Sequence, residues 1–327
     1  MALLEVKNLH TYFKTKKGTV KAVNDVSYSL EPGRTIGIVG ESGSGKSVSA
    51  MSILRLLDDN GYIASGSIRF DGMELTTLPL SDMYHIRGNA ISVIFQEPMT
   101  SLNPVFSVER QLCEPFMIHQ GMRKKEARRS ALKMLYDVQI PNPETVMRQY
   151  PHQLSGGMRQ RVMIAMALCC NPKLIIADEP TTALDVTIQA QILDLLRDVK
   201  NKISGSIMLI THDLGVIAEM VDYVVVMYAG RVVEKGTVQE IFKDPRHPYT
   251  IGLQKSKPIV GREVDRLYSI PGNVPNPINM QPHCYFRDRC SMRCDACRGE
   301  YPPMVQVSPT HFVACYRCTE TVKEENR

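Results

Sequence analysis

The chain is 327 residues long, with 43% hydrophobic and 22% charged residues, no tryptophan, 8 phenylalanines and 13 tyrosines. This composition is typical of a globular protein and excludes disordered and collagen-like chains. Lysine and arginine (39) exceed aspartate and glutamate (34), which gives a net charge of only +5. The charges are spread along the chain, so we expect no nucleic-acid partner.

The N-terminal segment lacks the features of an export signal. It becomes polar after four residues, and it has neither a secretory apolar region nor a cleavage site. No apolar run approaches the roughly 20 residues that a membrane-spanning helix needs. We therefore expect a cytosolic chain that reaches a membrane only through a partner.

Apolar runs of strand length recur along the chain. Ala22 to Leu30 alternates, as a half-buried strand does. Four later runs are continuous, as in strands covered on both faces: Thr35 to Val39, Leu174 to Ala177, Ile207 to Ile210 and Tyr223 to Met227. Helical stretches separate several of them, which predicts an α/β fold with a parallel sheet and crossover helices.

Two regions depart from this pattern. Between Gln96 and Leu154 the periodicity becomes helical, best seen from Lys124 to Val138, which predicts a helical insertion in the α/β core. The basic run Arg123 to Arg129 is expected to be a solvated helix face. From Pro245 onward the chain becomes rich in proline and then in cysteine, so we expect a small C-terminal appendage that begins near Asp244.

A phosphate-binding loop follows the predicted strand Thr35 to Val39. The residues Gly40-Glu41-Ser42-Gly43-Ser44-Gly45-Lys46-Ser47 fit the pattern GxxxxGK[ST], and a helical segment, Val48 to Leu57, comes next. Glycines allow the backbone N–H groups to curl around phosphates, and the helix N-terminus adds positive potential. We expect Lys46 to reach the β- and γ-phosphates and the Ser47 hydroxyl to bind Mg²⁺.

Polar side chains stand at the ends of three other predicted strands. Asp178 and Glu179 end the strand that begins at Leu174, Gln96 follows Ile91 to Phe95, and His212 follows Ile207 to Thr211. Ligands bind at the carboxyl ends of parallel strands. We therefore expect Asp178 to serve Mg²⁺ and Glu179 to orient or deprotonate a water molecule in line with the γ-phosphate. A neutral His212 could hydrogen-bond a γ-phosphate oxygen.

A second anion cradle is predicted at Leu154-Ser155-Gly156-Gly157-Met158-Arg159-Gln160. Ser155 can cap the helical run that follows, and two glycines stand at the helix N-terminus. One nucleotide in its own site need not use both cradles. The simplest interpretation is a dimer in which each subunit's Ser-Gly-Gly closes over the other's nucleotide.

Together these motifs resemble those of the ATP-binding cassette (ABC) ATPases, in family order, with a D-loop at Ala183-Leu184-Asp185. The resemblance covers residue 1 to about 250. It implies an α/β P-loop NTPase core in residues 1–243, with an antiparallel β subdomain and a helical subdomain at about 97–170, and a Cys-rich extension in 244–327. It also implies ATP and Mg²⁺ as cofactors.

The resemblance also implies roles for particular residues. The catalytic residues would be Glu179, His212 and Gln96. Mg²⁺ would be held by Ser47, Gln96 and Asp178. The nucleotide would be bound by the following residues: Gly40, Glu41, Ser42, Gly43, Ser44, Gly45, Lys46, Ser47, Asp178, Ser155, Gly157 and Asp185. An aromatic ring, Phe13 or the neighbouring Tyr12, would stack on adenine.

Longer stretches narrow the resemblance. IFQEPMTSLNP (Ile94 to Pro104), YPHQLSGGMRQRVMIAMAL (Tyr150 to Leu168) and HPYT (His247 to Thr250) resemble the peptide, nickel and opine branch of ABC importers. VGESGSGKSV is similar to the D-type ATPase of dipeptide and oligopeptide importers. This implies ATP-driven peptide uptake by a heterodimer with an F-type ATPase and two permeases, which dock near Gln96 and Glu97 to Pro104. An extracytoplasmic peptide-binding protein would feed this complex, with the ATPase on the cytoplasmic face of the inner membrane.

Two alternatives stay open. A soluble cassette protein that works on ribosomes or in DNA repair would usually have two fused cassettes or a long coiled coil, and the sequence shows neither. An exporter, or a nickel or opine importer, is also compatible, because no residue of such a subunit should touch the transported substrate.

Six of the nine cysteines lie between Cys284 and Cys318. In a reducing compartment this favours a metal over disulfides. Cys294-x2-Cys297 and Cys315-x2-Cys318, seventeen residues apart, fit a zinc ribbon. The family resemblance instead implies a [4Fe-4S] cluster held by Cys284, Cys290, Cys297 and Cys315, with Cys294 and Cys318 as extra thiols. An empty or disulfide-bonded site is the third possibility. His283 and His311 are expected to be surface histidines.

Overall fold

The computed structural model describes residues 2–182, 184–203, 205–256, 268–278 and 280–319. The chain forms two compact units, each built from segments that are distant in the sequence. Unit 1 comprises Met1–Leu30, Ile36–Thr76 and Thr211–Arg327. Unit 2 comprises Glu31–Thr35 and Thr77–Ile210.

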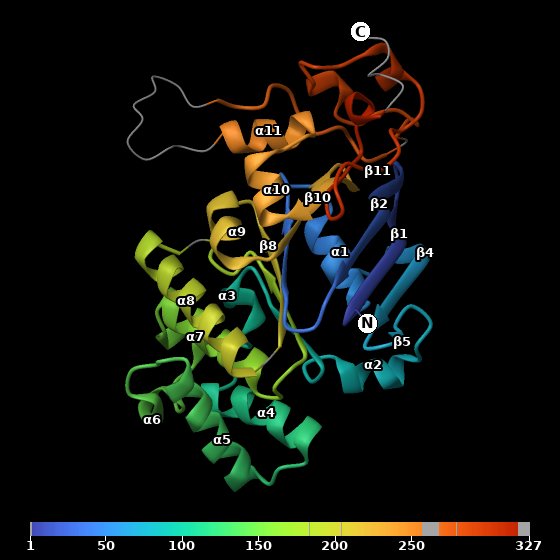
Figure 1. Ribbon diagram of the computed structural model, residues 1–327. Coiled ribbons are helices and arrows are strands. Elements are labelled where there is room, and N and C mark those ends of the chain that lie inside the picture. The colour runs from blue at the N-terminus through green and yellow to red at the C-terminus, as the bar shows by residue number, and fades with distance from the viewer. Residues whose placement is uncertain (1, 183, 204, 257–267, 279, 320–327) are drawn as a thin grey trace. The chain divides into compact units, whose positions relative to one another are not determined.

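Unit 1 contains a four-stranded antiparallel sheet in the order β2-β1-β4-β5 (Figure 1). Its strands are β1 (Leu4–Thr15), β2 (Gly18–Leu30), β4 (Gly61–Phe70) and β5 (Met73–Glu74). One face is buried and packs on helix α1 (Lys46–Ile53), where Thr11 Oγ1 lies 2.8 Å from Ser52 Oγ and Tyr28 Oη lies 3.0 Å from Ser49 Oγ. The antiparallel β subdomain is therefore confirmed.

A second set of strands in unit 1 has the order β11-β12-β10-β9-β3. Its bounds are β3 (Thr35–Val39), β9 (Tyr223–Tyr228), β10 (Arg231–Thr237), β11 (Val305–Gln306) and β12 (Phe312–Val313). β3 pairs parallel with β9, and all five of its residues are buried, as its continuous apolar run predicts. Helix α9 (Leu214–Met220) packs closely here, because a Cβ on Gly37 would lie 2.6 Å from Ile217 Cδ1.

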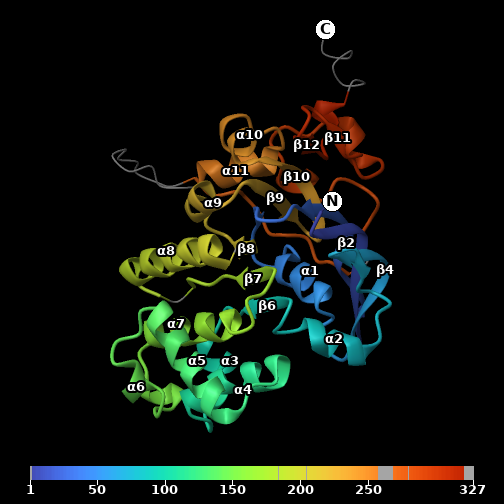
Figure 2. The same ribbon diagram turned by 60° about the horizontal axis from the view of Figure 1, so that its bottom comes forward.

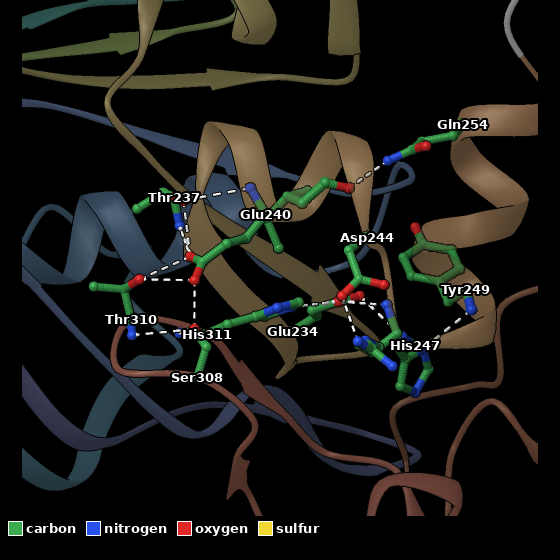
Figure 3. A network of polar contacts seen from close by, with 12 residues as sticks. Glu234, Thr237, Glu240, Asp244, His247, Tyr249, Gln254, Ser308, Thr310 and His311 are labelled. Carbon is green, nitrogen blue, oxygen red and sulfur yellow. Dashed lines mark hydrogen bonds and ion pairs between the residues drawn. The ribbon is translucent and has the colours of Figure 1, made fainter.

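Two carboxylates join residues 308–311 to β10 and to helix α10 (Val238–Lys243) (Figure 3). Glu234 is fully buried, and it accepts from the backbone N–H of His247 at 3.0 Å and from His311 Nε2 at 2.7 Å. Glu240 completes the capping box of α10 by accepting from the backbone N–H of Thr237, and it also accepts from the hydroxyls of Ser308 and Thr310. The prediction that His311 is a surface histidine is thus wrong, because its ring pairs with Glu234 in the interior.

His247 makes the stability of unit 1 depend on pH. Its side chain caps helix α11 (Pro248–Lys255) by accepting from the N–H of Tyr249 at 3.1 Å, and it is 2% exposed. Burial lowers the pKa of His247 to about 4, although the negative charge of Glu234 acts in the other direction and raises it. Protons therefore bind the unfolded state more readily between pH 6.5 and 4.

We expect the chain to lose up to about 3 kcal/mol of stability as the pH falls from 6.5 to 4. His247→Asn keeps a side-chain oxygen that can cap the helix but does not titrate, so its loss over the same range should be smaller. Thermal unfolding temperatures of both chains between pH 4 and pH 7.5 test this. Parallel curves would show that His247 is not responsible.

Unit 2 consists of three parallel strands and a set of helices (Figure 2). The strands are β6 (Ile91–Ile94), β7 (Leu174–Asp178) and β8 (Ser206–Thr211). The helices are α2 (Leu80–Ile86), α3 (Pro98–Ser101), α4 (Val108–Gln120), α5 (Lys124–Asp137), α6 (Pro143–Val146), α7 (Gly156–Leu168) and α8 (Val186–Ile203). None of the helices in the described ranges is both long and apolar enough to cross a membrane.

Helices α3 to α6 form the predicted helical insertion. In α5 the residues Ala127, Ala131 and Leu135 are buried on one face, whereas the basic residues of its first turns are largely exposed. This confirms the prediction that the basic run is a solvated helix face. The three-to-four-residue spacing of the buried positions explains why the sequence revealed this helix.

Candidate functional site

The phosphate loop connects β3 to α1 in unit 1, and glycines are required in it. A Cβ on Gly40 would lie 2.2 Å from the carbonyl oxygen of Met227, and one on Gly45 would lie 2.3 Å from that of Ala22. Gly40, Gly43 and Gly45 all have positive φ, at 156°, 76° and 94°. The loop therefore packs so closely on β2 and β9 that Gly40 and Gly45 leave no room for a side chain.

Lys46 is the first residue of α1, and the residue is 5% exposed. Its Nζ donates to the carbonyl oxygens of Gly40 at 2.9 Å and Glu41 at 3.1 Å. The ammonium group is therefore held within the curve of the loop, beside the N-terminus of a helix. This arrangement places a fixed positive charge beside a helix N-terminus, which suits the phosphates of a nucleotide.

Two residues that sequence reasoning missed hold the loop from the C-terminal part of unit 1. The Tyr249 hydroxyl accepts from the backbone N–H of Glu41 at 2.8 Å. The Arg289 guanidinium donates to both carboxylate oxygens of Glu41, at 2.8 and 3.2 Å. The HPYT motif contains Tyr249, but only the folded chain brings position 289 to position 41.

Phe13 and Tyr12 lie on opposite faces of β1, because side chains alternate along a strand. Phe13 shares its face with Thr11, which contacts α1 through Ser52. Tyr12 lies on the other face, where its hydroxyl is 3.0 Å from His10 Nδ1 and donates to Asn24 Oδ1 at 3.3 Å. Phe13 thus lies on the face of β1 that packs on α1, the helix after the phosphate loop. We therefore expect Phe13, and not Tyr12, to stack on adenine.

We expect Phe13→Ala to weaken ATP binding by a factor of about 5 to 100, since stacking on a base contributes about 1–3 kcal/mol. Tyr12→Ala, the matched control on the other face, should change affinity less. Equilibrium titration with ATP measures both. A larger loss in Tyr12→Ala would reverse the assignment.

In unit 2, Glu179 follows β7 with a backbone φ of 46°, in the left-handed region. Its carboxylate accepts from Gln96 Nε2 at 3.1 Å and from Thr182 Oγ1 at 2.9 Å, and its N–H donates to the carbonyl of Ile210 at 2.8 Å. Non-glycine residues adopt this conformation uncommonly, and such local strain is one feature of functional sites. Eight other non-glycine residues of the described chain share it, so the hydrogen bonds of the carboxylate, and not φ alone, single out Glu179. Asp178, one residue earlier, is 6% exposed.

The helix cap predicted for the second cradle is present in unit 2. Ser155 caps α7 by accepting from the N–H of Met158 at 3.3 Å, and Gly156 and Gly157 form the first turn. Gln160, buried on the same helix, donates to the carbonyl of Pro180 at 2.6 Å. This bond ties the cradle helix to the segment that follows Glu179.

The remaining predicted residues occupy loops. Asp185 is exposed and caps α8 by accepting from the N–H of Ile188 at 3.0 Å, while Ala183 of the D-loop lies outside the described residues. His212 is exposed directly after β8. Of the three side chains expected at Mg²⁺, Ser47 belongs to unit 1, and Gln96 and Asp178 belong to unit 2.

Two thiols of the cysteine segment lie close together. Cys294 Sγ lies 3.6 Å from Cys297 Sγ, and none of the nine cysteines, all of them among the described residues, forms a disulfide. Within the described parts of the chain, no group of three or more His, Cys, Asp or Glu side chains is placed to hold a metal ion. The structure therefore supports neither the cluster set Cys284, Cys290, Cys297 and Cys315 nor the zinc ribbon.

Comparison with protein families gives two matches. Residues 23–182 match the family model described as "ABC transporter", and residues 233–297 match "Oligopeptide/dipeptide transporter, C-terminal region". The first covers the phosphate loop and Glu179, and the second covers Tyr249 and Arg289.

Curated relatives match over nearly the whole chain. The oligopeptide transport ATP-binding protein AppD of Bacillus subtilis is 50% identical, with 99% of each chain covered. OppD of Salmonella typhimurium, also an oligopeptide transport ATP-binding protein, is 49% identical over 97% of this chain and 94% of its own. Among solved structures, the ATP-binding cassette MJ0796, a dimer bound to ADP and phosphate, is 27% identical with a TM-score of 0.65, covering 72% of this chain and 98% of that one.

Proposed function

The chain belongs to the ABC transporter family, among its oligopeptide transport ATP-binding proteins, and on this premise we propose that it is the ATP-hydrolysing subunit of an importer of di- or oligopeptides. The observation that carries the proposal is the phosphate loop Gly40–Ser47, which holds the Lys46 ammonium group inside its curve. The relatives named for oligopeptide transport supply the substrate class.

We assign different roles in ATP binding and hydrolysis to different residues of this chain. The loop and the α1 N-terminus bind the triphosphate, and Phe13 stacks on adenine. Mg²⁺, held by Ser47, Asp178 and Gln96, would offset charge on the phosphates. The Glu179 carboxylate, oriented by Gln96 and Thr182, aligns the attacking water and accepts its proton. His212 hydrogen-bonds the γ-phosphate.

The second cradle gives a reason for pairing with another ATPase. Ser155 and Gly157 would close over the nucleotide of a sister subunit, and Asp185 would line the same interface. The MJ0796 cassette, whose solved structure is a dimer with ADP and phosphate, supports this arrangement. We propose an F-type ATPase as the sister, with two permeases that dock near residues 97–104 and an extracytoplasmic peptide-binding protein.

In this scheme ATP closes the dimer, and hydrolysis reopens it. ATP contacts both cradles only in the closed state, so its binding energy biases the equilibrium toward closure. When hydrolysis removes the γ-phosphate, the nucleotide no longer binds the closed state more tightly than the open state. The permeases would follow these movements at the cytoplasmic face of the inner membrane.

Co-purification tests this assignment. The tagged chain, expressed with its neighbouring transport genes, should retain two membrane proteins and a second ATPase, and peptide-loaded binding protein should stimulate ATP hydrolysis. Stimulation by nickel or an opine, but not by peptides, would move the chain to another branch of importers. Recovery with ribosomes or DNA repair proteins would contradict the transport role.

For the cysteine segment, the [4Fe-4S] cluster stays a hypothesis that rests on spacing and resemblance. It needs Cys284, Cys290, Cys297 and Cys315 to converge on one cluster, and no step of ATP hydrolysis is assigned to it. Iron, sulfide and zinc analysis of anaerobically purified protein tests it. Stoichiometric zinc without iron–sulfur absorbance would refute the cluster.

A further inference from the structure

The C-terminal extension contacts the phosphate loop at Glu41 in two independent ways. Tyr249 accepts from the Glu41 backbone N–H, and Arg289 binds the Glu41 carboxylate with both terminal nitrogens. We propose that Arg289, supported by Tyr249, positions the phosphate loop, so that the affinity of the chain for ATP depends on its C-terminal extension. This inference rests on the proposed ATP-binding function of the loop.

The guanidinium of Arg289 is fixed on every side. Besides Glu41, it donates to the carbonyls of Pro271 at 2.9 Å and Ile270 at 3.3 Å, and its side chain is only 7% exposed. A planar fork with five donors cannot be replaced by a lysine without loss of these bonds. The Glu41 carboxylate, 27% exposed, therefore has one fixed orientation.

Aromatic packing fixes the second contact. Tyr249 is fully buried at the start of α11, with its ring centroid 4.7 Å from that of Tyr228 and 5.4 Å from that of Phe286. His247 caps the same helix, within the polar network of Figure 3. The Tyr249 hydroxyl is thus held by the interior of the unit, and it holds the loop at the residue after Gly40.

The negative charge of Glu41 links its pairing with Arg289 to the affinity for ATP. A carboxylate beside a triphosphate repels it, and the guanidinium of Arg289, paired with both carboxylate oxygens, neutralises that carboxylate. Without Arg289, Glu41 would be both mobile and uncompensated. Phe286 and Arg289 also lie between Cys284 and Cys290, so any change that moves this cysteine-bounded segment also moves the loop contact.

The test is a double-mutant cycle on the purified full chain, read as the Kd for MgATP. R289M should raise the Kd about tenfold, as expected for loss of a charge-assisted pair. E41Q removes the repulsion as well, so R289M/E41Q should bind several-fold more tightly than R289M. R287M, at an arginine of the same short helix that pairs with Asp288, should bind ATP like the unaltered chain.

Three further readouts separate positioning from misfolding. In the assembled ATPase, R289M should raise KM with kcat nearly unchanged. Y249F, which removes only the hydroxyl, should also raise the Kd. If R289M does not fold by circular dichroism, R289K carries the test, and it should bind ATP more weakly than the unaltered chain.

Unaltered ATP binding in R289M, or in R289K where that variant carries the test, would overturn the inference. So would a double variant no tighter than a folded R289M. Failure of the unaltered chain to bind ATP would instead contradict the proposed function.

Discussion

Glu179→Gln should bind ATP with nearly unchanged affinity and hydrolyse it about 100 to 10,000 times more slowly, the usual contribution of a general base. Glutamine keeps the shape of the side chain and can still contact Gln96 and Thr182, but it cannot accept a proton at neutral pH. Steady-state phosphate release from the assembled ATPase gives the rate, and titration with ATP gives the affinity. Because the γ-phosphate persists, the ATPase dimer should remain closed.

The matched control is Glu114→Gln, an exposed carboxylate on α4 in the same unit. It should hydrolyse ATP at the normal rate. Near-normal turnover in Glu179→Gln would remove this residue from the role of base, whatever its unusual backbone conformation.

Lys46→Ala should weaken ATP binding by a factor of about 10 to 100, since hydrogen bonds to charged groups contribute about 1.5–3 kcal/mol. The substitution removes the only side-chain cation of the loop itself, whereas the backbone N–H groups remain. Titration of the nucleotide-free chain with MgATP measures the change. Hydrolysis should fall with it, because the lysine also meets charge that develops on the transferred phosphoryl group.

Lys16→Ala serves as its control, because this lysine lies in the exposed turn between β1 and β2. It should bind ATP like the unaltered chain. The thermal unfolding temperature of Lys46→Ala should be recorded as well, since the side chain is buried and bonds two loop carbonyls. A folded Lys46→Ala chain with normal affinity would contradict the role of the loop.

Short sequence patterns predicted several individual strands, helices and helix caps correctly. The continuous run at Thr35 to Val39 is strand β3 with the same bounds, and the buried positions of α5 follow helical spacing. Ser155 caps its helix because capping depends on neighbours three residues apart. Such features need only a few consecutive residues, so the sequence alone reveals them.

Contacts between distant positions could not be predicted in the same way. The bond of Arg289 to Glu41 joins residues 248 positions apart, and the bond of His311 to Glu234 joins residues 77 apart. A histidine in a polar stretch gives no sign that a buried carboxylate will face it. The cysteine spacing fits more than one metal pattern, but spacing alone could not show that the described residues assemble no group of three or more metal ligands.

The most direct test of the central claim is a calorimetric titration of MgATP into the purified, nucleotide-free chain, alone and with its sister ATPase. We expect saturable binding of one ATP per chain, which persists in Glu179→Gln and weakens strongly in Lys46→Ala. If neither the chain nor the pair takes up ATP, the phosphate loop does not hold a nucleotide and the chain does not power transport.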